Sequence, residues 1–514
     1  MGKFDRGARS RALTGPVATV DRPLATAEGG PGRARDVRSE LFLLAVTNLV
    51  GEDTFYESGR QRDDRFCALV QQATREDPDW TARLIRWLRS DADLRSAALV
   101  AAAEYAKAGG PGPRAVIASV LQRPDEPGEF IAYWHAKYGR TLAGGKQRGL
   151  SDAVSRLYTE RAALKYDGAS HHYRFGDVIE LVHPTAVAPW QDELFRHLID
   201  RRHGRPDPRI GGSLPTVRAR AEAESVPPPE RRALLEGLDG PGRADFLRRV
   251  GGTWEWLSGW LQGPMDALAW ESVIPSMGYM ALLRNLRNFD EAGVSDAVAG
   301  QVAAKLADPA EVARSRQFPL RFLSAYKAAP SLRWAWPLEQ AVQHSLANVP
   351  GLPGRTLVLL DLSGSMWSPL SGRSRLQRWE AAALFGVALG LRARSADVVA
   401  YGTSWQRVPL SPGGSLLSAI TGLRNLGGTD TFGALAATYA GHDRVVILTD
   451  EQAQPTRWGR RSLPPSPVVT YNLAGYRAAH LESGPDRVTV GGLTDQGFRM
   501  LDLLDRRSRG DWPF

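Results

Sequence analysis

A carboxylate and two hydroxyls occupy alternate positions directly after a short apolar run. Asp361, Ser363 and Ser365 follow "TLVLL" (356–360), which predicts a strand buried on both faces. Alternate side chains of an extended turn can all point toward one ion. Three uses are compatible with this stretch: a metal site, a nucleophilic serine, or a turn held by its own side chains.

Two further oxygen-bearing side chains follow later strands or loops of the same region. Thr429 lies in the loop "LGGTDTF", and Asp450 closes the apolar run "RVVILTD". Because parallel strands bring their carboxyl ends to one edge of a sheet, we expect these groups to lie together. No His or Cys accompanies them. Hard oxygen ligands with few carboxylates favour Mg²⁺ or Mn²⁺.

The enzymatic alternatives find less support in the residues. The stretch lacks the Gly-x-Ser-x-Gly elbow of serine hydrolases. His442 and His480 are expected at the surface rather than as bases. Ser363 stands where a phosphatase-like Asp-x-Asp motif would need a second carboxylate, and no general base accompanies the ion set. The chain is therefore predicted not to be an enzyme.

The patterning divides the chain into three parts. Residues 1–36 are rich in Gly, Pro, Ala and Arg, and we predict a flexible arm there. Residues 37–350 show apolar positions at helical spacing in a series of short segments, which predicts a helical solenoid, with 204–232 as an exposed linker or loop. Residues 355–514 alternate β-branched apolar runs with helical segments, which predicts a doubly wound parallel sheet.

The bulk composition constrains the setting of the protein. The single cysteine, Cys67, excludes an internal disulfide framework and favours a reducing compartment. No apolar run approaches the ~20 residues of a membrane span, and no apolar segment follows the basic N-terminus. A cytoplasmic protein without membrane contact is predicted.

Local charge is more informative than the net charge of +9, because the excess of Arg over Lys can reflect a GC-rich coding sequence. Basic residues outnumber acidic ones between positions 140 and 174, and tyrosines are interleaved with them. Such a cluster suits phosphate contacts, and tyrosines can stack on bases, although each tyrosine taken singly is more often a core residue. The candidate RNA-binding residues in this cluster are Arg140, Lys146, Arg148, Lys165, His172 and Arg174.

Two family resemblances rest on these motifs. The elements "DLSGSM", "GGTDT" and "LTD", in that order, resemble the von Willebrand factor A domain with its metal-ion-dependent adhesion site, which implies that Asp361, Ser363, Ser365, Thr429 and Asp450 surround the ion. The helical segments, among them "LKYDGASHHYRFGDVIELVHP" and "MALLRNLRNF", resemble in order the TROVE module of Ro-like RNA-binding proteins. In that module Lys165 and His183 match RNA-binding positions, whereas Asp167 and Gly168 depart from the usual basic character.

The resemblance implies a monomeric ring of HEAT-like helices closed by the A domain. Such a ring binds Y-like small RNAs and single-stranded 3′ ends of misfolded RNA, and in bacteria it acts as an adaptor in RNA quality control beside a 3′ exoribonuclease. DNA is not expected as a partner. The alternative is a protein-adhesion module on a helical solenoid, which grips an acidic partner through the divalent ion without RNA. A metal-dependent hydrolase is the third and weakest reading.

Overall fold

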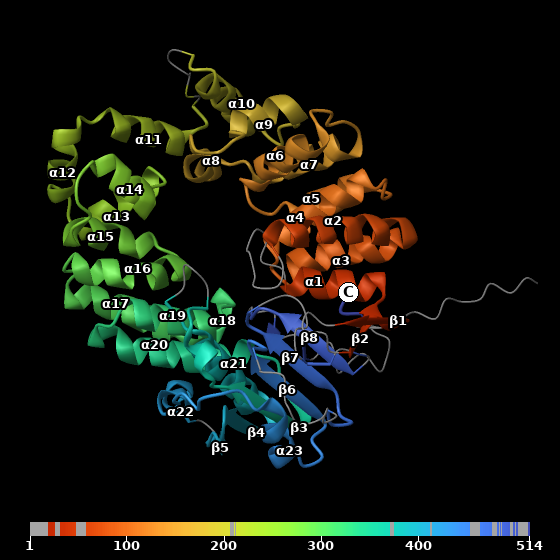
Figure 1. Ribbon diagram of the computed structural model, residues 1–514. Coiled ribbons are helices and arrows are strands. Elements are labelled where there is room, and N and C mark those ends of the chain that lie inside the picture. Colours follow the sequence, from red (N-terminus) through yellow and green to blue (C-terminus); the bar gives the residue numbers. More distant parts are fainter. Residues whose placement is uncertain are drawn as a thin grey trace, which may run out of the picture.

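A long run of helices precedes a parallel sheet in the computed structural model of the chain (Figure 1). No described helix is long and apolar enough to span a membrane. The structure describes residues 19–25, 31–47, 58–205, 210, 212–370, 375–411, 414–452, 463–474, 481–482, 484, 486–493, 497–498, 500–501 and 512–514.

The helical half runs from residue 37 to residue 348, and consecutive helices pack against one another as they turn through space (Figure 1). Its elements are α1 (Val37–Thr47), α2 (Gly59–Glu76), α3 (Pro78–Ser90), α4 (Arg95–Lys107), α5 (Pro113–Val120), α6 (Glu126–Tyr138), α7 (Gly145–Leu157), α8 (Glu160–Tyr166), α9 (Phe175–Val182), α10 (Pro189–Arg202), α11 (Pro215–Ser225), α12 (Pro228–Glu236), α13 (Gly240–Arg249), α14 (Trp254–Leu261), α15 (Ala267–Val273), η1 (Ile274–Ser276), α16 (Tyr279–Glu291), α17 (Asp296–Ala307), α18 (Pro309–Ser315), α19 (Pro319–Ala328), α20 (Leu332–Ser345) and η2 (Leu346–Asn348).

Local sequence explains several of these helix boundaries. The Ser58 hydroxyl accepts a hydrogen bond from the backbone of Gln61, and the Gln61 side chain accepts one from the backbone of Ser58, so α2 begins at a capping box. Asp77 caps α3, whose first residue is Pro78. Gly149 allows α5 and α7 to approach closely, because a Cβ atom there would lie 2.7 Å from the carbonyl oxygen of Arg114. Caps and small residues thus fix where neighbouring helices start and meet.

The C-terminal half contains a six-stranded sheet of order β5-β4-β3-β6-β7-β8, in which only β5 is antiparallel. Its strands and helices are β3 (Leu352–Asp361), η3 (Gly364–Trp367), α21 (Arg378–Arg392), β4 (Ala393–Tyr401), β5 (Trp405–Arg407), α22 (Leu416–Thr421), α23 (Thr431–Thr438), β6 (Arg444–Thr449), β7 (Val468–Asn472) and β8 (Arg487–Gly491).

Helices cover both faces of this sheet, which makes it doubly wound. Val358 and Leu360 of β3 join the core that includes α21, whereas Leu357 and Leu359 join the core that includes α23. The alternation follows from the two-residue period of a strand. The core on the α21 face is continuous with the core of α11–α20, so the sheet and the second half of the helices form one packed body.

The two ends of the helical run meet across the sheet, and the elements form a ring (Figure 1). Helix α1 contacts β8, and the guanidinium of Arg35 donates to the carbonyl oxygen of Arg487 at 2.8 Å. Trp512 and Phe514 pack against Trp80, with ring centroids 4.9 Å and 5.5 Å away. The predicted fold class, a helical-repeat ring plus a doubly wound α/β domain, is confirmed.

Two segments differ from the sequence-based predictions. Within the predicted flexible arm, β1 (Thr19–Ala25) and β2 (Pro31–Arg35) pair as an antiparallel hairpin, while residues 1–18 lie outside the described residues. The expected linker 204–232 contains α11 and the start of α12. Periodicity misses α11 because Arg220 provides part of its buried face: its guanidinium donates to the carbonyl oxygens of Val250 and Gly251.

Candidate metal centre and nucleic-acid interface

The first candidate site lies where β3 and β6 end. Asp361 is the last residue of β3, and its carboxylate is fully buried. It accepts a hydrogen bond from the backbone of Ser363 at 2.9 Å and another from the hydroxyl of Thr449 at 2.6 Å. The bond from the Ser363 backbone closes a turn held by the Asp361 side chain, which the sequence also allows as an alternative to a metal site. Thr449, which the sequence analysis did not single out, fixes the second carboxylate oxygen.

Asp450 completes a chain of oxygen atoms at this edge. The hydroxyls of Ser363 and Ser365 lie 3.4 Å apart, and the Ser365 hydroxyl donates to the Asp450 carboxylate at 3.1 Å. Asp450 is fully buried. The structure therefore brings together four of the five predicted metal ligands: Asp361, Ser363, Ser365 and Asp450. They lie at the carboxyl ends of the neighbouring parallel strands β3 and β6.

Thr429, the fifth predicted ligand, lies on an adjoining loop. The backbone of Gly364 donates to the carbonyl oxygen of Gly427, and that of Asp430 to the carbonyl oxygen of Gly402. These bonds hold the loop beside the turn after β3. Among the described residues, Thr429 forms no hydrogen bond with the other four side chains, so its part as a ligand stays a prediction.

A basic residue that sequence reasoning missed also reaches this site. The guanidinium of Arg378, at the start of α21, donates to the second oxygen of Asp450 at 3.0 Å. Ser368 and Arg378 lie on paired segments, since the Arg378 backbone donates to the carbonyl oxygen of Ser368. The chain thus folds back as a hairpin after η3, which the local sequence does not signal.

The electrostatics of the site favour a cation. Burial raises the pKa of Asp361 to about 6, and the nearby carboxylate of Asp450 adds to the rise, although hydrogen bonds from Ser363 and Thr449 lower it. Arg378 pairs with Asp450, whereas the bonds to Asp361 come from the Ser363 backbone and the Thr449 hydroxyl, which leaves negative charge that a hard cation would neutralise. No cluster of three or more His, Cys, Asp or Glu side chains suited to a metal occurs among the described residues. A cation here would therefore need hydroxyls and water as further ligands.

His442 differs from its predicted surface position. It is buried, and its Nε2 atom lies 2.8 Å from the carboxylate of Asp397. Burial alone would raise the pKa of Asp397, but hydrogen bonds from His442, Arg355 and Arg407 outweigh it and lower the pKa to about 2. His442 is thus a buried partner of Asp397 in β4, away from the candidate metal centre. His480 lies outside the described residues.

The second candidate site surrounds the end of α6. The Nδ1 atom of His135 lies 2.6 Å from the Tyr173 hydroxyl, and the ring centroids of His172 and Tyr173 are 4.9 Å apart, so His172 adjoins the end of α6. Arg140 follows that helix end, and the pKa of His135 is lowered first by burial and then by the Arg140 charge. The ammonium of Lys146 lies 4.8 Å from the ring centre of Trp134, one residue before His135. Three of the predicted RNA-binding residues are therefore neighbours around one helix end.

Two more predicted residues adjoin this cluster through α7 and α9. The side chain of Gln147 donates to the carbonyl oxygen of Leu181 at 3.3 Å, which places the start of α7 beside the end of α9. Arg148 follows Gln147, and His183 ends α9; both are exposed. We call Arg140, Lys146, Arg148, His172 and His183 the α6–α9 basic cluster.

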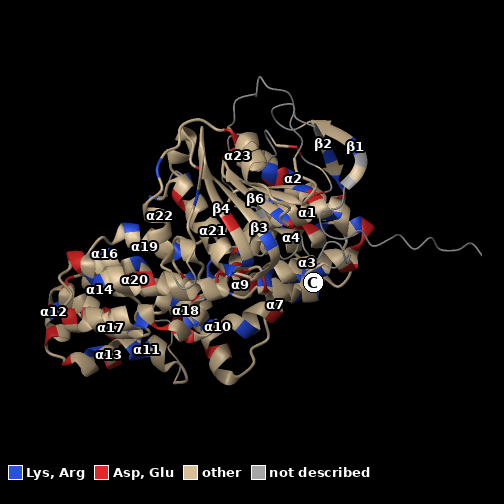
Figure 2. Cartoon of the chain, turned by 90° about the horizontal axis from the view of Figure 1, so that it is seen from below, with Lys and Arg blue, Asp and Glu red and all other residues tan. Residues whose placement is uncertain are grey.

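Three cationic groups of the cluster have no carboxylate partner among the described residues. In the described part of the chain, no carboxylate forms an ion pair with Arg140, Lys146 or Arg148, whereas many other arginines are paired. Figure 2 shows blue and red residues intermixed over both halves of the molecule. Unpaired cations are the groups that can exchange counterions for phosphates.

The two remaining predicted RNA-binding residues differ in their surroundings. Lys165 is exposed, and its ammonium lies 5.1 Å from the ring centre of Tyr166. Arg174 donates to the buried carboxylate of Asp167 at 3.0 Å. It therefore neutralises a buried charge, and it is not free in the way Arg148 is. The preference for core tyrosines holds for Tyr158, which is fully buried.

Comparisons with known proteins agree with this architecture. Residues 252–353 match the family model of the TROVE domain. A crystal structure of the RO (RSR) protein of Deinococcus radiodurans superposes with a TM-score of 0.68 at 19% sequence identity, over 92% of this chain and 100% of that chain. A search of curated protein sequences found no match. The chain therefore has the fold of that RO (RSR) protein, and residues 252–353 are similar to the TROVE domain.

Proposed function

We propose that the protein is a non-catalytic RNA-binding ring. The observation that carries this proposal is the α6–α9 basic cluster, whose cations lack carboxylate partners among the described residues. The TROVE-domain match and the Ro fold support it. Arginine, lysine and histidine side chains would contact phosphates, and half-buried tyrosines beside them would stack on unpaired bases.

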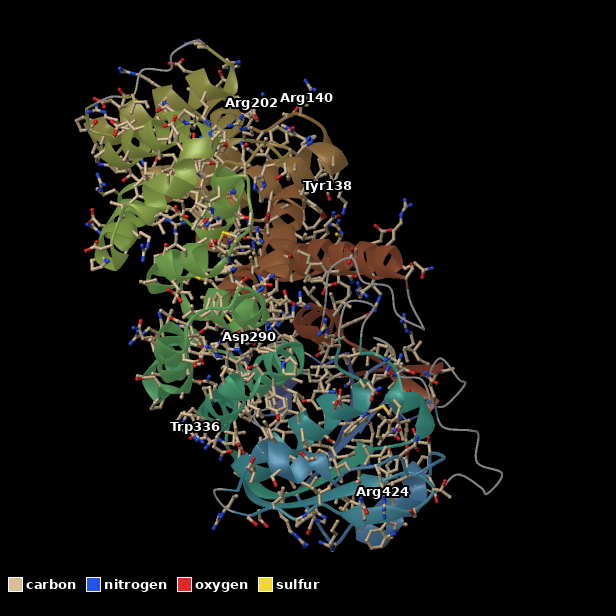
Figure 3. The ribbon with its side chains drawn as sticks, turned by 90° about the vertical axis from the view of Figure 1, so that its left-hand side faces the viewer. Tyr138, Arg140, Arg202, Asp290, Trp336 and Arg424 are labelled. Atoms are coloured by element: carbon tan, nitrogen blue, oxygen red, sulfur yellow. The ribbon has the colours of Figure 1, made fainter. Side chains whose placement is uncertain are left out.

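Fluorescence polarisation with a stem-loop RNA carrying a single-stranded 3′ tail tests the proposal. We expect Arg148→Ala, Lys165→Ala and His183→Ala, combined, to weaken binding and to flatten its salt dependence, by about 0.7 in log–log slope for each lost phosphate contact on a single strand. Arg424→Ala is the control, since Arg424 lies on the α/β domain, far from Tyr138 and Arg140 (Figure 3). Absence of RNA binding, or equal affinities of triple variant and control, would refute the proposal.

The finer features of this function belong to the same proposal. The RNAs would be Y-like small RNAs and the 3′ ends of misfolded RNA. The protein would act in the cytoplasm as a monomeric adaptor beside a 3′ exoribonuclease. Sequencing of RNA that copurifies with the native protein identifies the bound class, and an absorbance ratio typical of bare protein would contradict it.

The α/β domain supports a second candidate function, a metal-dependent adhesion module of the von Willebrand factor A type. The specific observation is the buried pair of carboxylates, Asp361 and Asp450, which are connected through Ser363 and Ser365 at the carboxyl edge of the sheet. These residues, with Ser363 and Thr429, would hold Mg²⁺ or Mn²⁺, and the ion would accept an acidic group of a partner. Capture of a partner in Mg²⁺ but not in EDTA, by an RNA-free protein, would favour this function over RNA binding.

A further inference from the structure

A cavity lies at the junction between the helical half and the α/β domain, and the α6–α9 basic cluster takes no part in it. Its volume is about 210 Å³. Helix α16 provides one wall, the end of α19 provides the floor, and Arg375 of the α/β domain closes one side. Both halves of the molecule therefore contribute residues to a single hollow.

The polar side chains of this cavity are suited to an anion. They are Arg284, Arg287, Asn288 and Arg375, and no carboxylate of the described residues lines the cavity. In the described part of the chain, Arg284 and Arg375 form no ion pair, and both are exposed. Arg287 differs, because its guanidinium lies 3.3 Å from Glu291. Two free guanidinium groups from different domains thus face one space.

Two acidic residues line an adjoining hollow that shares Arg287 and Arg375 with the cavity, and both of them have basic partners. Asp290, which lines the adjoining hollow, accepts hydrogen bonds from Arg333 at 3.3 Å and from the indole of Trp334 at 2.8 Å. Glu291 lines that hollow too and pairs with Arg287. The local charge of the cavity therefore stays positive, and it is set by Arg284 and Arg375.

The other side chains that line the cavity are apolar. Leu283, Leu286, Ala325, Ala328 and Ala329 surround the arginines. Guanidinium groups bind phosphates through two parallel hydrogen bonds, and small apolar side chains leave room for the face of a sugar or base. The volume is below the ~300 Å³ at which drug-sized ligand pockets begin, which limits the occupant to about one nucleotide.

We propose that this cavity binds one phosphate-bearing nucleotide, with Arg284 and Arg375 holding the phosphate from the two domains. The nucleotide is either part of an RNA strand or free. The first case rests on the proposed RNA-binding function, and the second does not. Because the arginines belong to different domains, the bound phosphate would also tie the helical half to the α/β domain.

Binding of a uridine dodecamer and of uridine monophosphate to the full chain tests this proposal. We expect Arg284→Gln and Arg375→Gln to weaken the ligand that binds by about three- to tenfold each. For the dodecamer, each should lower the salt slope by about 0.7. Arg314→Gln is the matched control, because Arg314 is an exposed arginine paired with Glu311 outside the cavity. Melting temperatures verify that the variants fold.

The outcomes distinguish an RNA strand from a free nucleotide as the ligand, and the cavity proposal from the proposed RNA-binding function. Loss of dodecamer binding alone assigns the cavity to an RNA strand, and loss of monophosphate binding assigns it to a free nucleotide. If wild type binds monophosphate but no RNA, the proposed function fails while the cavity stands. If RNA binds and both cavity variants match Arg314→Gln with both ligands, or if neither ligand binds wild type, the nucleotide site is refuted.

Discussion

Replacing Arg378 by Met should destabilise the α/β domain unless a divalent cation is present. In the wild type its guanidinium lies 3.0 Å from Asp450, whose side chain is fully buried, while Arg378 retains 20% of its exposure. Methionine replaces the unbranched apolar stem of Arg378 but not its charge, so among the described residues the variant leaves Asp450 with no cationic partner. A cation bound at the strand ends would then supply the missing positive charge.

The size of the effect follows from this geometry. At an effective dielectric constant of ~20, unit charges at that separation attract by about 5 kcal/mol, and the cost of desolvating both groups offsets much of this. Breaking a buried pair from one side costs about 3–5 kcal/mol, and the partial exposure of Arg378 favours the lower end. For a unit of this size, about 3 kcal/mol corresponds to a fall of about 6–12 °C in melting temperature.

Thermal unfolding in EDTA measures the cost of losing the Arg378 charge, and unfolding in Mg²⁺ measures the stabilisation by a bound cation. We expect Arg378→Met to melt well below wild type in EDTA and to gain more from Mg²⁺ than wild type does. Arg392→Met is the control from the same helix, because Arg392 donates to the carbonyl oxygen of Val349 and leaves no buried charge when removed. Equal responses of Arg378→Met and wild type to Mg²⁺ would refute the cation site, and an unchanged melting temperature in EDTA would refute the electrostatic argument.

Three further predictions concern stability. Asp397→Asn should lower stability at neutral pH: because folding lowers the pKa of Asp397 to about 2, its contribution to stability is full above about pH 4 and is lost as the pH falls toward 2, so the stabilities of wild type and variant, from denaturant titrations followed by circular dichroism, should converge as the pH approaches 2. Gly386→Ala should destabilise by about 1–3 kcal/mol in denaturant titrations, because the new Cβ atom would overlap Leu360 of the sheet, and a neutral result would show that α21 can move away. Gly300→Ala, inside α17 with no atom within 4 Å of the new Cβ, should instead stabilise by about 0.5–1 kcal/mol, and a loss of stability would contradict the helix-propensity argument.

The sheet and its edge were largely predictable from the sequence. Runs such as "RVVILTD" carry no polar residue inside, which is the pattern of a strand covered on both faces. Asp361 and Asp450 end two such runs, and strands β3 and β6 proved to be adjacent. The meeting of these carboxylates is therefore a consequence of parallel topology, which a single sequence can reveal.

Contacts that depend on chain reversal or on paired charges were not predictable. Arg378 reaches Asp450 only because the segment after η3 folds back on itself, and nothing in its residue types signals that hairpin. Arg174 looked like one more cation of a basic cluster, yet the fold uses it to neutralise Asp167. Sequence shows which charges are present, whereas burial decides which of them are free.

The two ends of the ring meet at a seam, where the N-terminal helices contact β8 and the C-terminal aromatic residues. This seam determines which molecules can pass through the ring. Among the described residues, the contacts that join the two ends include the bond from Arg35 to the backbone of β8 and the packing of Trp512 and Phe514 on aromatic side chains of α1 and α3. Opening such a junction requires these non-covalent contacts to break, and their free energy sets the population of the open form. A linear strand can enter a closed circle by its end, but a covalently circular strand can be encircled only while the seam stands open. The rate at which the ring encircles a circular RNA would therefore report how often this junction opens.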